Sequence, residues 1–133
     1  MKIIRLRTEN REHPYGIDVK NPVFSWNIFA EEQNWKQKSY RICVEKDGKC
    51  VWDSGKVMSD RMVQIPYEGK SLQSDTRYEW QVEVQGTRGE CSKSEKTWFE
   101  TGLYEKEDWK GIYIGETKDH SYHLYRGIFQ AKK

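Results

Sequence analysis

The stretch that decides the fold is residues 77–85, RYEWQVEVQ. Every second residue in it is apolar, in the order Tyr78, Trp80, Val82 and Val84. Successive side chains of a β-strand point to opposite faces, so this alternation predicts a strand with one buried and one solvated face. The apolar face of such a strand must pack against a second layer of structure, which makes a layered β-protein the first hypothesis.

Shorter stretches of the same kind recur on both sides of this strand, separated by turn residues. Strands are expected at residues 2–7, 23–29, 39–46, 50–56, near 62–67 and at 94–101. Their inward faces are expected to carry Ile4 and Leu6, then Phe24, Trp26 and Ile28, then Tyr40, Ile42 and Val44. Asp47-Gly48 predicts a tight hairpin turn, because both of its positions need positive φ. The polar stretch 30–38 has no apolar stripe and is expected to be a loop.

These stretches give about seven strands by residue 102, and their even spacing is typical of a β-sandwich or barrel. The spacing of Leu72 and Tyr78 resembles the tyrosine corner of fibronectin type III and immunoglobulin-like sandwiches, in which the phenol bonds to nearby backbone. We therefore expect an all-β, fibronectin type III or immunoglobulin-like sandwich over residues 1–102. Residues 103–133 are expected to be a linker and the truncated start of a further β domain, which adds a short β extension.

Composition excludes several classes of partner. The 133 residues are 33% charged, but both signs are interspersed and the net charge is only +2, which is not the footprint of a nucleic-acid binder. No stretch approaches the ~20 apolar residues of a membrane span. The beginning of the chain has no apolar signal segment, so a cytoplasmic location is expected, or a secreted one if a signal peptide has been removed.

The three cysteines do not form an even-numbered disulfide framework. Cys43 and Cys50 flank the predicted hairpin turn and are able to pair, but reduced, half-buried thiols are the favoured reading for these two and for Cys91. No cysteine has a histidine placed beside it by the sequence, so no nucleophilic thiol is expected.

No catalytic residue, cofactor or metal site is expected in this chain. The candidate acids read as turn or strand-end residues rather than a catalytic pair: Asp53, Asp60, Asp75, Glu100 and Asp108. His120 and His123 are three residues apart, which would point their rings to opposite faces of a strand, and His13 is far away in the sequence. Gly86 and Gly89 join two strands and do not form a phosphate loop.

The six tryptophans divide by their surroundings. Trp26 and Trp80 are expected in the core, and Trp52 and Trp98 in the core or on a sheet face. Trp35 lies in a polar loop and Trp109 in the expected linker, so these two are the candidates for an exposed ring. Such a ring marks a domain interface or a sugar platform.

Five segments occur in one order along the chain: HPYGIDVKNPVFSW at 13–26, VWDSGKVMSD at 51–60, the strand at 77–85, WFETGL at 98–103 and DWKGIYIG at 108–115. Together they resemble the N-terminal region of bacterial α-L-rhamnosidases of glycoside hydrolase family 78. The resemblance implies a fibronectin type III-like domain, followed by a second β-sandwich that starts near residue 108. In that family, whose enzymes hydrolyse terminal α-L-rhamnose from glycosides with inversion, the catalytic carboxylates lie on a later (α/α)6 toroid, so no residue here inherits a catalytic role.

The resemblance implies a non-catalytic accessory domain with a structural role, whose partners are the downstream domains of the same polypeptide. Two other functions stay open at this point. One is a carbohydrate-binding module, which would need exposed aromatic rings on one face or loop end. The other is a stand-alone adhesion or protein-interaction sandwich, which the fold alone does not exclude.

Overall fold

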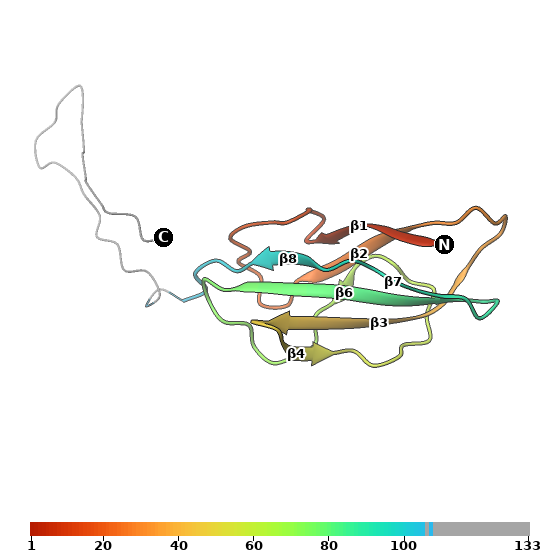
Figure 1. Ribbon diagram of the computed structural model, residues 1–133. Coiled ribbons are helices and arrows are strands. Elements are labelled where there is room, and N and C mark those ends of the chain that lie inside the picture. Colours follow the sequence, from red (N-terminus) through yellow and green to blue (C-terminus); the bar gives the residue numbers. More distant parts are fainter. Residues whose placement is uncertain (106, 108–133) are drawn as a thin grey trace, which may run out of the picture.

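The computed structural model describes residues 1–105 and 107, and they form a sandwich of two antiparallel sheets (Figure 1). One sheet has the order β1-β2-β5, and the other has the order β4-β3-β6-β7, with β8 also paired to β6. The strands are β1 Lys2–Thr8, β2 Val23–Phe29, β3 Gln37–Lys46, β4 Lys49–Asp53, β5 Ile65–Pro66, β6 Arg77–Gly86, β7 Cys91–Lys93 and β8 Thr97–Glu100. The prediction of an all-β sandwich is confirmed, with eight strands in the described residues where about seven were expected.

Strand β6 is the centre of the larger sheet, because it pairs with β3 on one side and with β7 and β8 on the other. Its apolar residues Tyr78, Trp80, Val82 and Val84 are all buried. The alternation read from residues 77–85 therefore corresponds to the inward face of the sandwich. The same holds for Tyr40, Ile42 and Val44 on β3.

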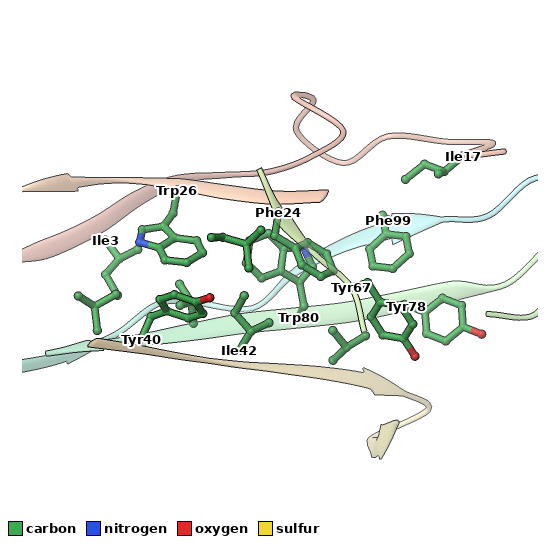
Figure 2. Close-up of a cluster of buried hydrophobic side chains, with 14 of the residues drawn as sticks. Ile3, Ile17, Phe24, Trp26, Tyr40, Ile42, Tyr67, Tyr78, Trp80 and Phe99 are labelled. Carbon is green, nitrogen blue, oxygen red and sulfur yellow. The ribbon is translucent and has the colours of Figure 1, made fainter. Parts of the chain in front are cut away.

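Aromatic rings from both sheets meet in the middle of the core (Figure 2). The Phe24 ring of β2 lies 4.5 Å from the Trp80 ring and 6.0 Å from the Phe99 ring, measured between centroids. The Tyr78 and Phe99 rings stack at 5.5 Å. Because β2 belongs to one sheet and β6 and β8 to the other, the contacts of Phe24 hold the two layers together, whereas the Tyr78–Phe99 stack lies within the larger sheet.

The polar atoms of three buried rings, those of Trp80, Trp26 and Tyr78, have hydrogen-bond partners. The indole N–H of Trp80 donates to the Thr8 hydroxyl at 3.0 Å, and that of Trp26 donates to the Gln37 side-chain oxygen at 3.1 Å. The Tyr78 hydroxyl accepts a hydrogen bond from the backbone N–H of Gln73 at 2.8 Å, which is the bond of a tyrosine corner. Leu72, the other residue of that spacing, is buried in the same core cluster.

Several strand predictions are wrong in detail. In β1 the buried apolar residue is Ile3 rather than Ile4, because Arg5 has a φ of 52° and the pairing register with β2 shifts between Ile4 and Arg7. Such a bulge reverses the face on which the following side chains lie. Leu6 therefore lies on the same face of β1 as Ile3 and packs against the core.

The strand expected at 94–101 is confirmed only as β8, Thr97–Glu100, and it is preceded by a strand that was not expected, β7 at Cys91–Lys93. Lys93 lies opposite Glu83 and Thr97 lies opposite Trp80, so four steps along one chain match three along the other. The extra residue interrupts regular pairing at Ser94, whose hydroxyl accepts a hydrogen bond from the Val82 backbone N–H at 3.0 Å. In addition, the strand expected near 62–67 is reduced to Ile65–Pro66.

The hairpin turn at Asp47-Gly48 is confirmed, with φ of 50° and 77° at its two positions. The loop expected at 30–38 is confirmed over residues 30–36, before β3 begins at Gln37. The expected division at residue 102 stays a prediction, because Lys106 and residues 108–133 lie outside the described part of the chain.

Candidate functional site

At one end of the sandwich, the segment that follows β8 lies beside exposed apolar side chains. The loop before β2 and the segment after β8 both lie at this end, opposite the N-terminus (Figure 1). The two segments run in parallel, because the Ile17 N–H donates to the Glu100 carbonyl at 2.9 Å and the Gly102 N–H donates to the Ile17 carbonyl at 2.7 Å. They approach so closely that a Cβ on Gly102 would lie 3.2 Å from the Gly16 carbonyl oxygen.

Three apolar residues on these two segments are exposed to solvent: Tyr15 at 68%, Val19 at 41% and Leu103 at 39%. We call them the exit surface. Beside them, the Tyr104 hydroxyl donates to the Val19 carbonyl at 3.3 Å, and Lys20 pairs with Glu105 at 3.1 Å. The exit surface is thus apolar, and the ion pair of Lys20 and Glu105 lies on the same two segments. Protein interfaces also combine apolar residues with a charged rim.

The Tyr15 side chain packs against a cluster of neighbouring rings. Its ring meets the edge of the Trp98 ring with centroids 5.0 Å apart, and the His13 ring stacks on Trp98 at the same distance. The Arg77 guanidinium lies 4.0 Å from the Trp98 ring centroid and pairs with Glu100 at 2.7 Å. Tyr15 is therefore exposed but held in place, so little side-chain freedom remains to be lost when a partner covers it.

The sequence singled out other aromatic residues than these. Trp35 was expected to be exposed, but it is half-buried and packs against the core cluster. Gly86 makes this possible because it has no side chain. A Cβ atom added to Gly86 would lie only 2.7 Å from the indole nitrogen of Trp35, so the ring occupies the space that a side chain would need. Trp109 lies outside the described residues. The expected core residues Trp26, Leu72, Tyr78 and Trp80 are all buried.

No tryptophan in the described residues is exposed: Trp26 and Trp80 are buried, and Trp35, Trp52 and Trp98 are half-buried. A sugar-binding platform usually needs an open aromatic face. Trp98 comes nearest, but the His13 ring and the Arg77 guanidinium both lie against its ring. Sequence reasoning missed Tyr15, although a tyrosine beside Pro14 and Gly16 in a polar loop could have drawn attention to it.

The outer face of the larger sheet carries a groove of about 400 Å³ between β3, β6 and β7. Its charged and polar side chains bond to one another across the groove. Lys56 donates to the Gln85 side-chain oxygen at 2.7 Å, and Lys93 lies 3.7 Å from Glu83. The lining therefore presents no unpaired cluster of one charge.

Two of the carboxylates considered as candidate acids, Asp53 and Glu100, are paired with arginines. The Arg41 guanidinium and the Gly55 backbone N–H hold the pKa of Asp53 below its usual value, so this group is ionised at neutral pH and is no proton donor. Glu100 is paired with Arg77. Within residues 1–105 and 107, no group of three histidine, cysteine or acidic side chains is placed to hold a metal ion. The described part also contains no helix able to cross a membrane.

Residues 3–105 match the family model for the Rha78A-like, N-terminal immunoglobulin domain. This chain belongs to that family. The immunoglobulin-like sandwich expected from the sequence, and its resemblance to the N-terminal region of α-L-rhamnosidases, are both confirmed.

Relatives of this Rha78A-like domain are parts of much longer proteins. An α-L-rhamnosidase of Streptomyces avermitilis is 33% identical over 120 residues, which are 86% of this chain and 12% of that protein. The crystal structure of an α-L-rhamnosidase from Streptomyces avermitilis complexed with L-rhamnose superposes with a TM-score of 0.78 at 33% identity, over 82% of this chain and 11% of that one.

The structure of an α-L-rhamnosidase from Dictyoglumus thermophilum also superposes with a TM-score of 0.78, at 36% identity, over 83% of this chain and 13% of that chain. The Rha78A-like domain thus spans about an eighth of the relatives it matches.

Proposed function

We propose that this chain is the non-catalytic N-terminal domain of a bacterial α-L-rhamnosidase, an enzyme that hydrolyses terminal α-L-rhamnose from glycosides. Its role in that protein is structural: it packs on the domains that follow in the same polypeptide and fixes their position. The observation that carries the proposal is the exit surface, whose exposed apolar residues lie on the two paired segments from which the described chain leaves the sandwich.

The position of the exit surface supports a partner in the same polypeptide. A domain tethered a few residues away is present at millimolar effective concentration, so even a small apolar patch next to the tether is covered much of the time. Tyrosine is well suited to such a contact, because its ring gives apolar area and its hydroxyl tolerates water. Tyr15 is held in place by Trp98, which lowers the entropic cost of docking.

The absence of a catalytic role is supported by what inverting glycoside hydrolysis requires. Two carboxyl groups must stand about 6.5–9.5 Å apart, one protonated and one activating water. Among the described residues, Asp53 is bound to Arg41 and Glu100 to Arg77. We expect the purified chain to give no turnover of an aryl α-L-rhamnoside, and measurable turnover that survives further purification would overturn this part of the proposal.

A substitution in the exit surface tests the packing role. In the longer polypeptide, Tyr15→Ser is expected to weaken the contact between domains by about 2 kcal/mol, as the loss of an aromatic interface anchor does. The thermal unfolding temperature should therefore fall in the longer protein and stay nearly unchanged in the isolated chain. Differential scanning calorimetry of both proteins makes the comparison.

Phe29→Ser is the matched control. Phe29 is 58% exposed at the end of β2 and lies opposite Lys2, so it is at the far end of the sandwich. It should have the same small effect in both proteins. If Tyr15→Ser changes the longer protein no more than Phe29→Ser does, the exit surface is not the interface.

The cytoplasmic location also remains a prediction, and fractionation of cells that express the longer protein tests it.

A further inference from the structure

Two of the three cysteines lie next to each other on the surface. Cys43 of β3 and Cys50 of β4 have their sulfur atoms 3.5 Å apart, and both are free thiols. Cys43 is half-buried and Cys50 is exposed, so small reagents reach the pair from solvent. Cys91, the third, belongs to β7 and is also exposed.

The hairpin itself brings the two thiols together. Cys43 lies between the buried residues Ile42 and Val44, so its side chain points to the outer face of the sheet. The next outward position on β3 is Glu45, and Cys50 is its partner on β4. Residues paired across two strands point to the same face, so Cys43 and Cys50 are diagonal neighbours on the outer surface.

Two features fix this placement. The Asp47-Gly48 turn determines the register of the hairpin, and a bulge leaves Val51 as an extra residue between the Val44–Trp52 and Glu45–Cys50 pairs. On the other side of Cys43, Asp53 is held by Arg41 at 2.6 Å. The sulfur atoms need to approach only from 3.5 Å to the bond length of about 2 Å.

The geometry points to a cross-hairpin disulfide between Cys43 and Cys50, formed reversibly by a small disulfide oxidant such as glutathione disulfide. This site is independent of the proposed packing function, because it lies on the β3–β4 hairpin and shares no residue with the exit surface.

The reaction is a pair of thiol–disulfide exchanges. The exposed thiolate of Cys50 attacks one sulfur of glutathione disulfide, which forms a mixed disulfide and releases one glutathione thiolate. Cys43 then gives its proton to solvent and attacks the Cys50 sulfur, and the second glutathione leaves. The protein dithiol is oxidised, the glutathione disulfide is reduced, and two glutathione thiols are the products.

The order of the two steps follows from the surroundings of Cys43. Burial and the hydrogen bond to Cys50 raise the pKa of Cys43 to about 11, so this thiol stays protonated at neutral pH and is a slow first nucleophile. Once Cys50 carries glutathione, Cys43 lies beside the sulfur that it must attack and no diffusion is needed.

The bond would fasten β4, which is the edge strand of the larger sheet, to β3. Trp52 on β4 packs against Phe24 at 6.3 Å and Tyr67 at 5.1 Å, so the hairpin carries part of the contact between the sheets. Restricting the unfolded chain by a cross-link stabilises the folded state, and we expect the oxidised protein to unfold at a higher temperature.

The test is oxidation of the whole chain with glutathione disulfide in mildly alkaline buffer, because thiol–disulfide exchange proceeds through a thiolate. Free thiols are counted after unfolding, and peptides are identified by mass spectrometry. The expected result is a loss of two thiols out of three, a mass lower by two hydrogen atoms, and a peptide that joins Cys43 to Cys50. Persistence of all three thiols overturns the proposal, as does a link that involves Cys91 or a second chain.

Three variants complete the test. Cys91→Ser should form the bond like the parent, with a higher unfolding temperature after oxidation. Cys43→Ser should stop at the mixed disulfide with glutathione on Cys50, with no such rise. In Cys50→Ser, the Cys43 thiol should react with glutathione disulfide at least tenfold more slowly than Cys50 does in Cys43→Ser, because Cys43 is half-buried. If Cys43→Ser and Cys91→Ser gain the same stability on oxidation, the cross-hairpin bond is not its source.

Discussion

Individual tyrosine side chains of this sandwich both pack in the core and form hydrogen bonds to the backbone. Tyr78 stacks on Phe99 in the core, and its hydroxyl accepts the hydrogen bond of the Gln73 N–H. Tyr67 acts in a similar way and donates its hydroxyl proton to the Lys70 carbonyl at 2.7 Å. A loop that leaves one sheet for the other has backbone groups without a strand partner, and a phenol from the core satisfies them.

We expect Tyr78→Phe to lower the free energy of unfolding by about 1–3 kcal/mol, because the Gln73 N–H loses its partner while the ring keeps its packing. Urea unfolding followed by fluorescence measures the change. Tyr15→Phe is the control, since it removes the same hydroxyl from a side chain that is 68% exposed. Equal stability of the two variants would show that the corner bond contributes nothing.

At the scale of elements, the β3–β4 hairpin combines a turn, a bulge and a surface ion pair. Asp53 ends β4 and accepts hydrogen bonds from the Arg41 guanidinium at 2.6 Å and from the Gly55 N–H at 2.8 Å. One carboxylate therefore ties β4 to β3 and also forms the turn that follows. This explains why the strand expected at 50–56 ends early at Asp53.

The lowered pKa of Asp53 makes this contribution dependent on pH. A carboxyl whose pKa is lower in the folded than in the unfolded state stabilises the fold above its usual pKa of about 4, and the stabilisation is lost as pH falls through the folded value. Asp53→Asn is expected to be less stable than the parent at pH 7, and the difference should shrink as pH falls below the usual pKa of about 4.

Thermal unfolding at several pH values gives this profile. Asp60→Asn removes the same charge from an exposed residue that forms no ion pair within the described residues, and it should show no such convergence. A difference between Asp53→Asn and parent that persists unchanged at acid pH would contradict the assignment.

At the scale of the whole molecule, stability depends on the rings that join the two sheets. Trp80 touches Phe24 of the opposite sheet and bonds to Thr8 of β1, so it links three strands at once (Figure 2). Removing it leaves a cavity at the centre of the core and an unpaired hydroxyl on Thr8.

Trp80→Ala is expected to cost about 3–5 kcal/mol, a large part of the ~5–15 kcal/mol margin of a small domain. Trp35→Ala should cost less, because its indole is half-buried at the edge of the core. Urea titrations followed by circular dichroism measure both variants. Equal losses would mean that the two rings contribute alike to the core.

Local patterns made most of the larger sheet predictable. The alternation at 77–85, the Asp47-Gly48 turn and the spacing of Leu72 and Tyr78 depend on residues close together in the chain. The local structure that these patterns form follows from strand geometry and from the φ angles of the turn, and it does not depend on where the segment lies in the fold. The amino-acid order of those segments is therefore sufficient for the sandwich and for the inward face of its central strand.

The bulges and the surface contacts depend on the partner strand and were decided only in three dimensions. Arg5 reverses the faces of β1, and the extra residue near Ser94 separates β7 from β8, because pairing with β2 and β6 sets the register there. The contact of Tyr15 with Trp98 and of Cys43 with Cys50 likewise requires a loop or strand to return across the sheet. The alternation of side chains is set within one strand and can be predicted from its sequence. Register and side-chain contacts are set by two segments together, so they depend on the tertiary structure.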